Sequence, residues 1–172
     1  LSKMVTTMLN ISKIETGNVD MNIEQFDIKP KLLTTFLGFE QLISKKGIEI
    51  VGFEDLESAT VHGDSAMIDQ VIYNLADNAV KFTNESGEIS LSIDNSNKDF
   101  ITVTVQDSGV GMIEEVKTHI FEKFYQGDTS RKSEGNGLGL ALVKTVSDLT
   151  NSTITVESEL GKGSKFIVRL PK

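Results

Sequence analysis

The chain has 172 residues, 38% of them hydrophobic, so it is long enough for one compact domain with its own core. A net charge of −8 and the absence of a basic run argue against binding to nucleic-acid phosphates. The sequence has no cysteine, no apolar run of about 18 residues and no signal-peptide pattern. It therefore predicts no disulfide, thiolate metal site or membrane contact, and it is compatible with a cytoplasmic location.

The first predicted element is a helix over residues 1–16, which Gly17 ends. Its apolar residues recur at spacings of three and four, as in the seam of a coiled coil or helix bundle: Leu1, Met4, Met8, Ile11 and Ile14. We interpret this helix as half of an interrupted bundle, with docking on its own domain as the alternative. Because the chain starts at Leu1 and not at Met, we also expect it to be a piece of a longer protein.

A polar connector with strand-like alternation around Phe26 follows the first helix. Pro30 is expected to open a second helix, because proline is tolerated in the first turn, and Gly47 to close it. Two short strands are then expected over residues 48–53 and 59–62, separated by an acidic loop.

The next helix carries the most informative stretch, residues 69–83, and Asp64 is well placed to cap it. One face of this helix is apolar and is expected to pack on a sheet: Ile68, Val71, Ile72, Leu75 and Ala79. Asn74, Asn78 and Lys81 fall at i, i+4 and i+7 and therefore line one stripe. Two amides and an ammonium offer oxygen ligands for a hard cation and a positive charge for phosphate. The alternative is an ordinary solvated helix face.

The remaining pattern predicts strands and helices in alternation. In chain order these are a hairpin over 88–94 and 100–107, a short helix over 113–124, a helix over 138–149, and strands over 154–157 and 165–170. In total, about three helices are expected on one face of a mixed, mostly antiparallel sheet of about five or six strands. The predicted fold is therefore of the α+β class, a two-layer α/β sandwich.

A glycine turn follows the strand that ends at Asp107. Gly109 and Gly111 permit backbone angles and close approaches that a side chain would block, so a flat ligand could lie against this turn. Asp107 could accept a hydrogen bond from an exocyclic amine such as that of adenine, worth about 1.5–3 kcal/mol. An ordinary structural turn is the alternative interpretation.

A second glycine cluster, residues 135–139, lies directly before a helix. Its backbone amides and the positive end of the helix dipole would make an anion site. The cluster is neither a Walker A loop nor a dinucleotide fingerprint, because the residues and context of both are missing. The polar segment 126–136 before it, which carries Arg131, is interpreted as a lid that orders over a ligand. The alternative is a surface loop without such a role.

Taken in order, these motifs resemble the catalytic ATP-binding domain of sensor histidine kinases, whose Bergerat fold is shared with gyrase, a heat-shock chaperone and a mismatch-repair ATPase. The resemblance covers residues 26–172, with 18–25 as a linker, and residues 1–17 resemble the end of the second helix of a dimerisation and phosphoacceptor domain. The matching segments are 74–83 (N box), 107–111 (G1 box), 121–124 (F box), 135–140 (G2 box) and the final glycine turn, 161–163.

The resemblance implies that the ligand is ATP with Mg²⁺. It implies that Asn78 binds the Mg²⁺ that bridges the phosphates, and that Asn74 lies near the metal and the phosphates. Lys81 is expected to approach the phosphates, so that Asn74 and Lys81 are the candidate catalytic residues. Phe82 is expected to pack beside the nucleotide.

The resemblance also assigns the base pocket and the lid. Asp107 is expected to accept from the adenine amine, with Gly109 and Gly111 shaping its pocket. Gly135, Gly137 and Gly139 are expected to form the hinge and the anion-binding turn of the lid, and Leu138 to bind the nucleotide with them. Arg131 is expected to reach a phosphate from the lid, and Phe121 and Phe124 to anchor its start.

Asn74 separates two branches of this superfamily. ATP-hydrolysing relatives and anti-sigma serine kinases carry a glutamate four residues before the metal-binding asparagine, as a general base. Asn74 cannot take a proton at neutral pH, which favours a protein-histidine kinase over an ATPase. A degenerate module that binds ATP without transferring it, and an ATPase with a base from elsewhere, are the alternatives.

The phosphorylated histidine of the family is missing. The two histidines, His62 and His119, are followed by Gly63 and Ile120 and not by an acidic residue. The sequence therefore predicts that this chain binds Mg·ATP but does not phosphorylate itself. Its expected partners are its own dimerisation and phosphoacceptor domain, in a homodimer, and the receiver domain of a response regulator.

Overall fold

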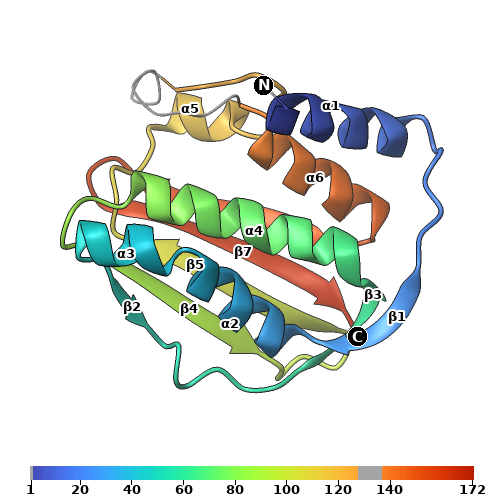
Figure 1. The fold of residues 1–172 in the computed structure, drawn as a ribbon, viewed down its shortest axis with the longest axis horizontal. Coiled ribbons are helices and arrows are strands. Elements are labelled where there is room, and N and C mark those ends of the chain that lie inside the picture. Colours follow the sequence, from blue (N-terminus) through green and yellow to red (C-terminus); the bar gives the residue numbers. More distant parts are fainter. Residues whose placement is uncertain (1, 128–136) are drawn as a thin grey trace.

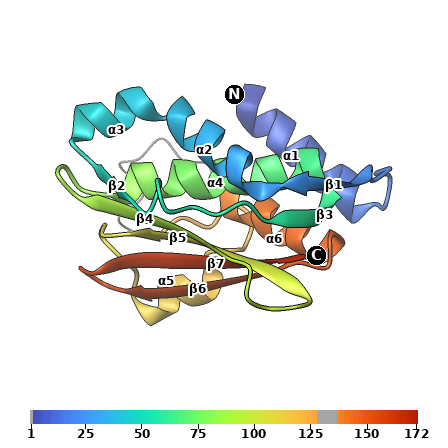
Figure 2. The same ribbon diagram turned by 90° about the horizontal axis from the view of Figure 1, so that it is seen from below.

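A five-stranded sheet forms one layer of the structure (Figures 1 and 2). The computed structural model describes residues 2–127 and 137–172. The strand order is β2 (Glu49–Val51), β4 (Glu88–Asp94), β5 (Phe100–Asp107), β7 (Gly163–Pro171) and β6 (Thr153–Glu159). Only the β2–β4 pair is parallel among these neighbours, and the others are antiparallel. The sheet is therefore mixed and mostly antiparallel, as predicted.

Helices form the second layer. Figures 1 and 2 show α2 (Ile28–Gly38), α4 (Ser65–Phe82) and α6 (Gly139–Leu149) on one face of the sheet. The other elements are α1 (Ser2–Glu15) beside α6, α3 (Glu40–Lys46) after α2, α5 (Glu114–His119) by β6, and an antiparallel ribbon of β1 (Ile23–Asp27) and β3 (Thr60–Asp64). Over the described residues, no helix is long and apolar enough to cross a membrane. The predicted two-layer α/β sandwich is confirmed.

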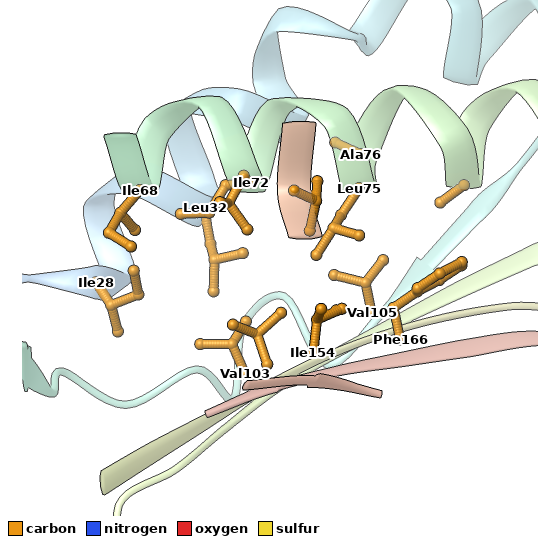
Figure 3. Close-up of a cluster of buried hydrophobic side chains, with 14 of the residues drawn as sticks. Ile28, Leu32, Ile68, Ile72, Leu75, Ala76, Val103, Val105, Ile154 and Phe166 are labelled. Carbon is orange, nitrogen blue, oxygen red and sulfur yellow. The ribbon is translucent and has the colours of Figure 1, made fainter. Parts of the chain in front are cut away.

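The core lies between α4 and the sheet (Figure 3). Ile68, Ile72 and Leu75 of α4 face Val103 and Val105 of β5, and all five side chains are buried. The period of 3.6 on the helix and of two on the strand produces these two apolar faces. Each such side chain contributes about 1.5–3 kcal/mol by its removal from water. The opposite stripe of α4 is left for polar residues.

Asp64 fixes the start of α4. Its side chain accepts a hydrogen bond from the Met67 N–H at 3.0 Å, which confirms the predicted cap. The second carboxylate oxygen accepts from the Asn22 N–H at 2.9 Å. One carboxylate thus joins the connector after α1 to the helix that carries the candidate site.

The single helix predicted from Pro30 to Gly47 is wrong in two respects. It begins earlier, at Ile28, because the Asp27 side chain caps it by accepting from the Lys29 N–H at 3.0 Å. It is also interrupted at Phe39, which separates α2 from α3. Gly38 is a weak helix former, and the break buries the Phe39 side chain in the core.

The first helix follows the alternative interpretation in part. α1 lies along α6, and Ile11 is only 1% exposed, so the helix docks on its own domain. Met4 and Met8, of the same predicted stripe, remain 41% and 40% exposed. The expected domain boundaries stay predictions, although β1, which pairs with β3, begins three residues before the boundary at residue 26.

Lys46 holds the other end of α4. Its Nζ donates to the carbonyl oxygens of Val80 and Lys81, at 2.7 and 3.1 Å. These carbonyls belong to the last turn of the helix, where no backbone donor follows in the helical ladder. Burial of the ammonium lowers the pKa of Lys46, and the charge of Glu85 opposes that shift.

We expect Lys46→Met to lower the free energy of unfolding by about 1–2 kcal/mol, because two helix-end carbonyls lose their side-chain donor while the apolar stem is kept. Urea unfolding followed by circular dichroism measures this change. Lys45→Met is the matched control, since Lys45 is exposed and the change in charge is identical. Equal unfolding midpoints for the two variants would contradict the assigned role of Lys46.

Candidate functional site

The polar stripe of α4 forms one wall of a pocket. The pocket lies between the C-terminal half of α4, the loop after β5 and the start of α6. Eight of the predicted site residues line it: Asn74, Asn78, Lys81, Phe82, Asp107, Gly111, Gly137 and Gly139. Side chains far apart in sequence are thus brought together, and their individual roles stay predictions.

Asn74 packs against the start of α6. Its amide nitrogen donates to the Gln70 carbonyl at 2.7 Å, within α4. Its Oδ1 lies 2.9 Å from the position that a Cβ atom would take at Gly139. A side chain at residue 139 would displace this amide, so Gly139 makes the room in which Asn74 faces the pocket. Farther along the stripe, Lys81 forms an ion pair of 3.8 Å with Asp77.

Asp107 is a buried carboxylate at the end of β5, and only 4% of its surface is exposed. Burial raises its pKa, and hydrogen bonds from the N–H groups of Gly109 and Ser164 partly offset that shift. Both of these bonds go to Oδ1, at 2.9 and 3.3 Å. Within the described residues, Oδ2 is the oxygen left to accept a bond from a ligand in the pocket.

Close backbone packing explains why residues 109 and 111 are glycines, and this reason is separate from the predicted approach of a ligand. A Cβ atom at Gly109 would collide with the carbonyl of Phe82, and one at Gly111 with the carbonyl of Glu159. Gly111 also has φ +65°, a conformation that side chains disfavour. Gly111 lines the pocket, whereas Gly109 is not among the lining residues. The two glycines let the loop fit between the end of α4 and the turn before β7.

Apolar side chains that the sequence did not single out form another wall. They come from the loop after β5, from α5 and its surroundings, and from α6: Val110, Met112, Val116, Ile120, Tyr125 and Leu140. An apolar wall with a few placed polar groups is the usual composition of a small-molecule site. Val110 and Leu140 lie inside the matched segments 107–111 and 135–140, whereas the sequence around the other four does not distinguish them from ordinary core residues.

The segment 128–136 lies outside the described residues, and so do the predicted Arg131 and Gly135. At its borders, the Phe124 N–H donates to the Gly137 carbonyl at 3.0 Å. The Phe124 side chain is half exposed and does not line the pocket, and Leu138 is buried in the core. Of Phe124, Gly137 and Leu138, which the structure describes, Gly137 reaches the pocket.

Two residues of α1, Lys3 and Thr7, also line the pocket. Neither was predicted, because the first helix was expected to pack on a partner. The histidines lie elsewhere. His62 is exposed on β3, and Nδ1 of His119 lies 2.7 Å from a carboxylate oxygen of Glu122 at the surface.

Residues 63–172 match the family described as histidine kinase-, DNA gyrase B-, and HSP90-like ATPase. The chain is 34% identical over 174 residues to hybrid signal transduction histidine kinase L of Dictyostelium discoideum, covering 96% of this chain and 10% of that protein. It is 31% identical over 175 residues to sensor histidine kinase RppB of Synechocystis, covering 99% and 38%. The chain thus spans well under half the length of either relative.

Two solved structures share the fold. Full-length ShkA in complex with AMPPNP superposes with a TM-score of 0.84 at 28% identity, covering 98% of this chain and 35% of that one. The nucleotide-free catalytic domain of histidine kinase ThkA gives a TM-score of 0.76 at 29% identity, covering 88% of this chain and 97% of that one. The family match spans more than half of the sequence, and the chain belongs to the histidine kinase-, DNA gyrase B- and HSP90-like ATPase family.

Proposed function

We propose that this chain is the ATP-binding catalytic domain of a sensor histidine kinase and belongs to the cytoplasmic portion of that kinase. It binds Mg·ATP and passes the γ-phosphoryl group to a histidine on a phosphoacceptor helix, from which a response regulator aspartate receives it. The observation that carries this proposal is the pocket itself. It combines a buried carboxylate, Asp107, with the stripe of Asn74, Asn78 and Lys81.

The residues around Asp107, at the end of the pocket proposed to hold the nucleotide base, favour adenine as that base. Oδ1 of Asp107 accepts from two backbone N–H groups, so its orientation is fixed and Oδ2 is the acceptor for an exocyclic amine. The apolar wall, including Val116 and Ile120, covers the faces of a flat ring. AMPPNP in the similar ShkA structure supports the same class of ligand.

The residues at the phosphate end of the pocket are consistent with a cation that enters bound to the nucleotide. Within the described residues there is no cluster of three or more His, Cys, Asp or Glu side chains that could hold a metal ion. Asn78 and Asn74 offer amide oxygens at the pocket. Mg²⁺ keeps most of its water and is commonly bound by one or two protein oxygens together with substrate phosphates, so this small set of donors fits it. Bound Mg²⁺ would supply positive charge to the phosphates.

The transfer itself requires mainly positioning and charge stabilisation. The imidazole nitrogen of the acceptor histidine forms a bond to the γ-phosphorus while the bond to the bridging oxygen breaks. The electron pair leaves with ADP, and a base of the acceptor domain takes the imidazole proton. In this proposal Lys81, which lines the pocket, balances charge on the phosphates. Asn74, which cannot act as a base, does not activate water for hydrolysis.

The exposed face of α1 supports the proposed partner. Met4, Val5, Met8 and Leu9 are each at least 40% exposed on this helix. An apolar helix face of this kind is stabilised by packing on other helices. In the proposed arrangement it belongs to the homodimeric phosphoacceptor bundle, of which α1 is one part, and the receiver domain of the response regulator is a further partner.

Asn78→Ala is expected to weaken binding of Mg·AMPPNP about tenfold or more, roughly 1.4 kcal/mol, because the metal loses its protein oxygen. Without Mg²⁺, the parent and the variant should bind the analogue almost equally. Calorimetry on the full chain measures both. Asn84→Ala, an exposed asparagine outside the pocket, is the matched control. A loss of the same size in the absence of Mg²⁺ would contradict a metal role for Asn78.

Asp107→Asn is expected to weaken AMPPNP binding by about 1.5–3 kcal/mol, roughly 10- to 150-fold. The amide oxygen can keep the bonds from Gly109 and Ser164, and the amide nitrogen then faces the adenine amine as a second donor. The matched probe is inosine triphosphate, which presents a carbonyl in place of the amine. The variant should lose the parent's preference for the adenine nucleotide, and an unchanged preference would exclude Asp107 as the amine acceptor.

The chain alone is expected not to become phosphorylated by radiolabelled ATP, because neither His62 nor His119 lines the pocket. Addition of the phosphoacceptor domain of the same protein should produce labelled acceptor, with little release of inorganic phosphate. Binding of ATP without transfer would instead support the degenerate module. Rapid phosphate release without the acceptor domain would support an ATPase.

A further inference from the structure

Helix α1 makes a side-chain contact near each of its ends with a segment beside the pocket. Figure 1 shows it lying beside α6. Near its start, Lys3 Nζ donates to the Tyr73 hydroxyl at 3.1 Å and lies 4.8 Å from the centre of that ring. Near its end, Glu15 forms an ion pair of 2.6 Å with Lys123. Tyr73 directly precedes Asn74 on α4, and Lys123 precedes the pocket-lining residue Tyr125. The helix is therefore held to two segments that each adjoin a lining residue of the same pocket.

Lys3 itself lines the pocket, together with Thr7 one turn later. Lys3 and Lys81 are the two cationic side chains among its described lining residues. Lys81 lies 3.8 Å from the Asp77 carboxylate, which offsets part of its charge. The partner of Lys3 is a neutral hydroxyl, so its charge is not neutralised by that bond.

This charge matters because the chain as a whole carries −8. A polyphosphate ligand must find its positive potential locally, from placed cations and its metal. Lys3 lines the pocket and contacts Tyr73, the residue before Asn74, so in the proposed binding mode its ammonium can reach the phosphates. Coulomb attraction between an ammonium and a phosphate is stronger at the effective dielectric of a protein surface than in bulk water.

We propose that α1 is a wall of the nucleotide pocket and that Lys3 turns from the Tyr73 hydroxyl to the phosphates when a nucleotide binds. The inference rests on the proposed function. Its consequence is a coupling: the phosphates stabilise the docked helix, and by reciprocity the docked helix raises nucleotide affinity. A helix that belongs to the phosphoacceptor part of the protein thereby reports on, and responds to, occupancy of the catalytic pocket.

The test compares Lys3→Met with Lys13→Met in the full chain. The two variants make the same change in charge on the same helix, and Lys13 does not line the pocket. Binding of Mg·AMPPNP and of adenosine is measured by calorimetry. Lys3→Met should weaken AMPPNP binding about five- to tenfold, leave adenosine binding unchanged, and differ from Lys13→Met in the first property only.

Tyr73→Phe separates charge from docking, because it removes the hydroxyl partner of Lys3 and keeps the ring. It should leave AMPPNP affinity unchanged or raise it. Hydrogen exchange supplies a second readout: AMPPNP should slow exchange of the amides of residues 4–14 in the parent and not in Lys3→Met.

Three outcomes would overturn the inference. These are unchanged AMPPNP affinity in Lys3→Met, an equal loss of AMPPNP and adenosine in that variant, and a loss in Tyr73→Phe as large as in Lys3→Met. The last two would assign Lys3 only to holding the helix. If the folded parent binds adenosine and AMPPNP to no measurable extent, the proposed function itself fails, which is a different result from a parent that binds and a Lys3 variant that is unaffected.

Discussion

The burial of one carboxylate, Asp107, is the constraint on which the candidate site depends. A charged group with 4% of its surface exposed is costly unless hydrogen bonds replace its water, and here the N–H groups of Gly109 and Ser164 do so. These bonds tie the loop after β5 to the start of β7. The same loop reaches the end of α4, where the Val110 N–H donates to the Phe82 carbonyl at 3.3 Å. Three elements therefore meet at one point, and the two glycines of the loop are the residues that let their backbones come so close.

Helix α4 turns this meeting point into a pocket because it serves the core and the site at once. Its apolar face is fixed against β5, so the direction of the opposite stripe, from Asn74 to Lys81, follows from core packing. Both ends of the helix are held, by Asp64 at the start and Lys46 at the end. A site built on an element secured in this way needs little reorganisation when a ligand arrives, which is the condition for electrostatic stabilisation of phosphoryl transfer.

The sequence predicted what local periodicity and motif order determine, namely the two-layer fold, the α4 cap, the β4–β5 hairpin and eight residues that the structure gathers around one pocket. It could not predict features that depend on distant packing. The break at Phe39 arises because that ring enters the core, and nothing in the neighbouring residues announces it. Val116 and Ile120 resemble core residues in the sequence, and only the fold shows that they line a pocket. The contact of Gly111 with the Glu159 carbonyl also depends on distant packing, and it gives this glycine a structural reason beside its predicted place at the pocket.

The first helix shows how one short segment can satisfy two surfaces. Ile11 is buried against the chain's own domain, whereas Met4, Val5, Met8 and Leu9 remain exposed on the same helix. Docking on α6 and packing in a bundle therefore use different side chains and do not compete for the same apolar surface. In the proposed function this arrangement gives the phosphoacceptor part a direct mechanical connection to the catalytic part, through Ile11 and through the contacts of Lys3 and Glu15. A change in the position of this helix would then alter the pocket wall without any change in the residues of α4 that are proposed to hold the phosphates.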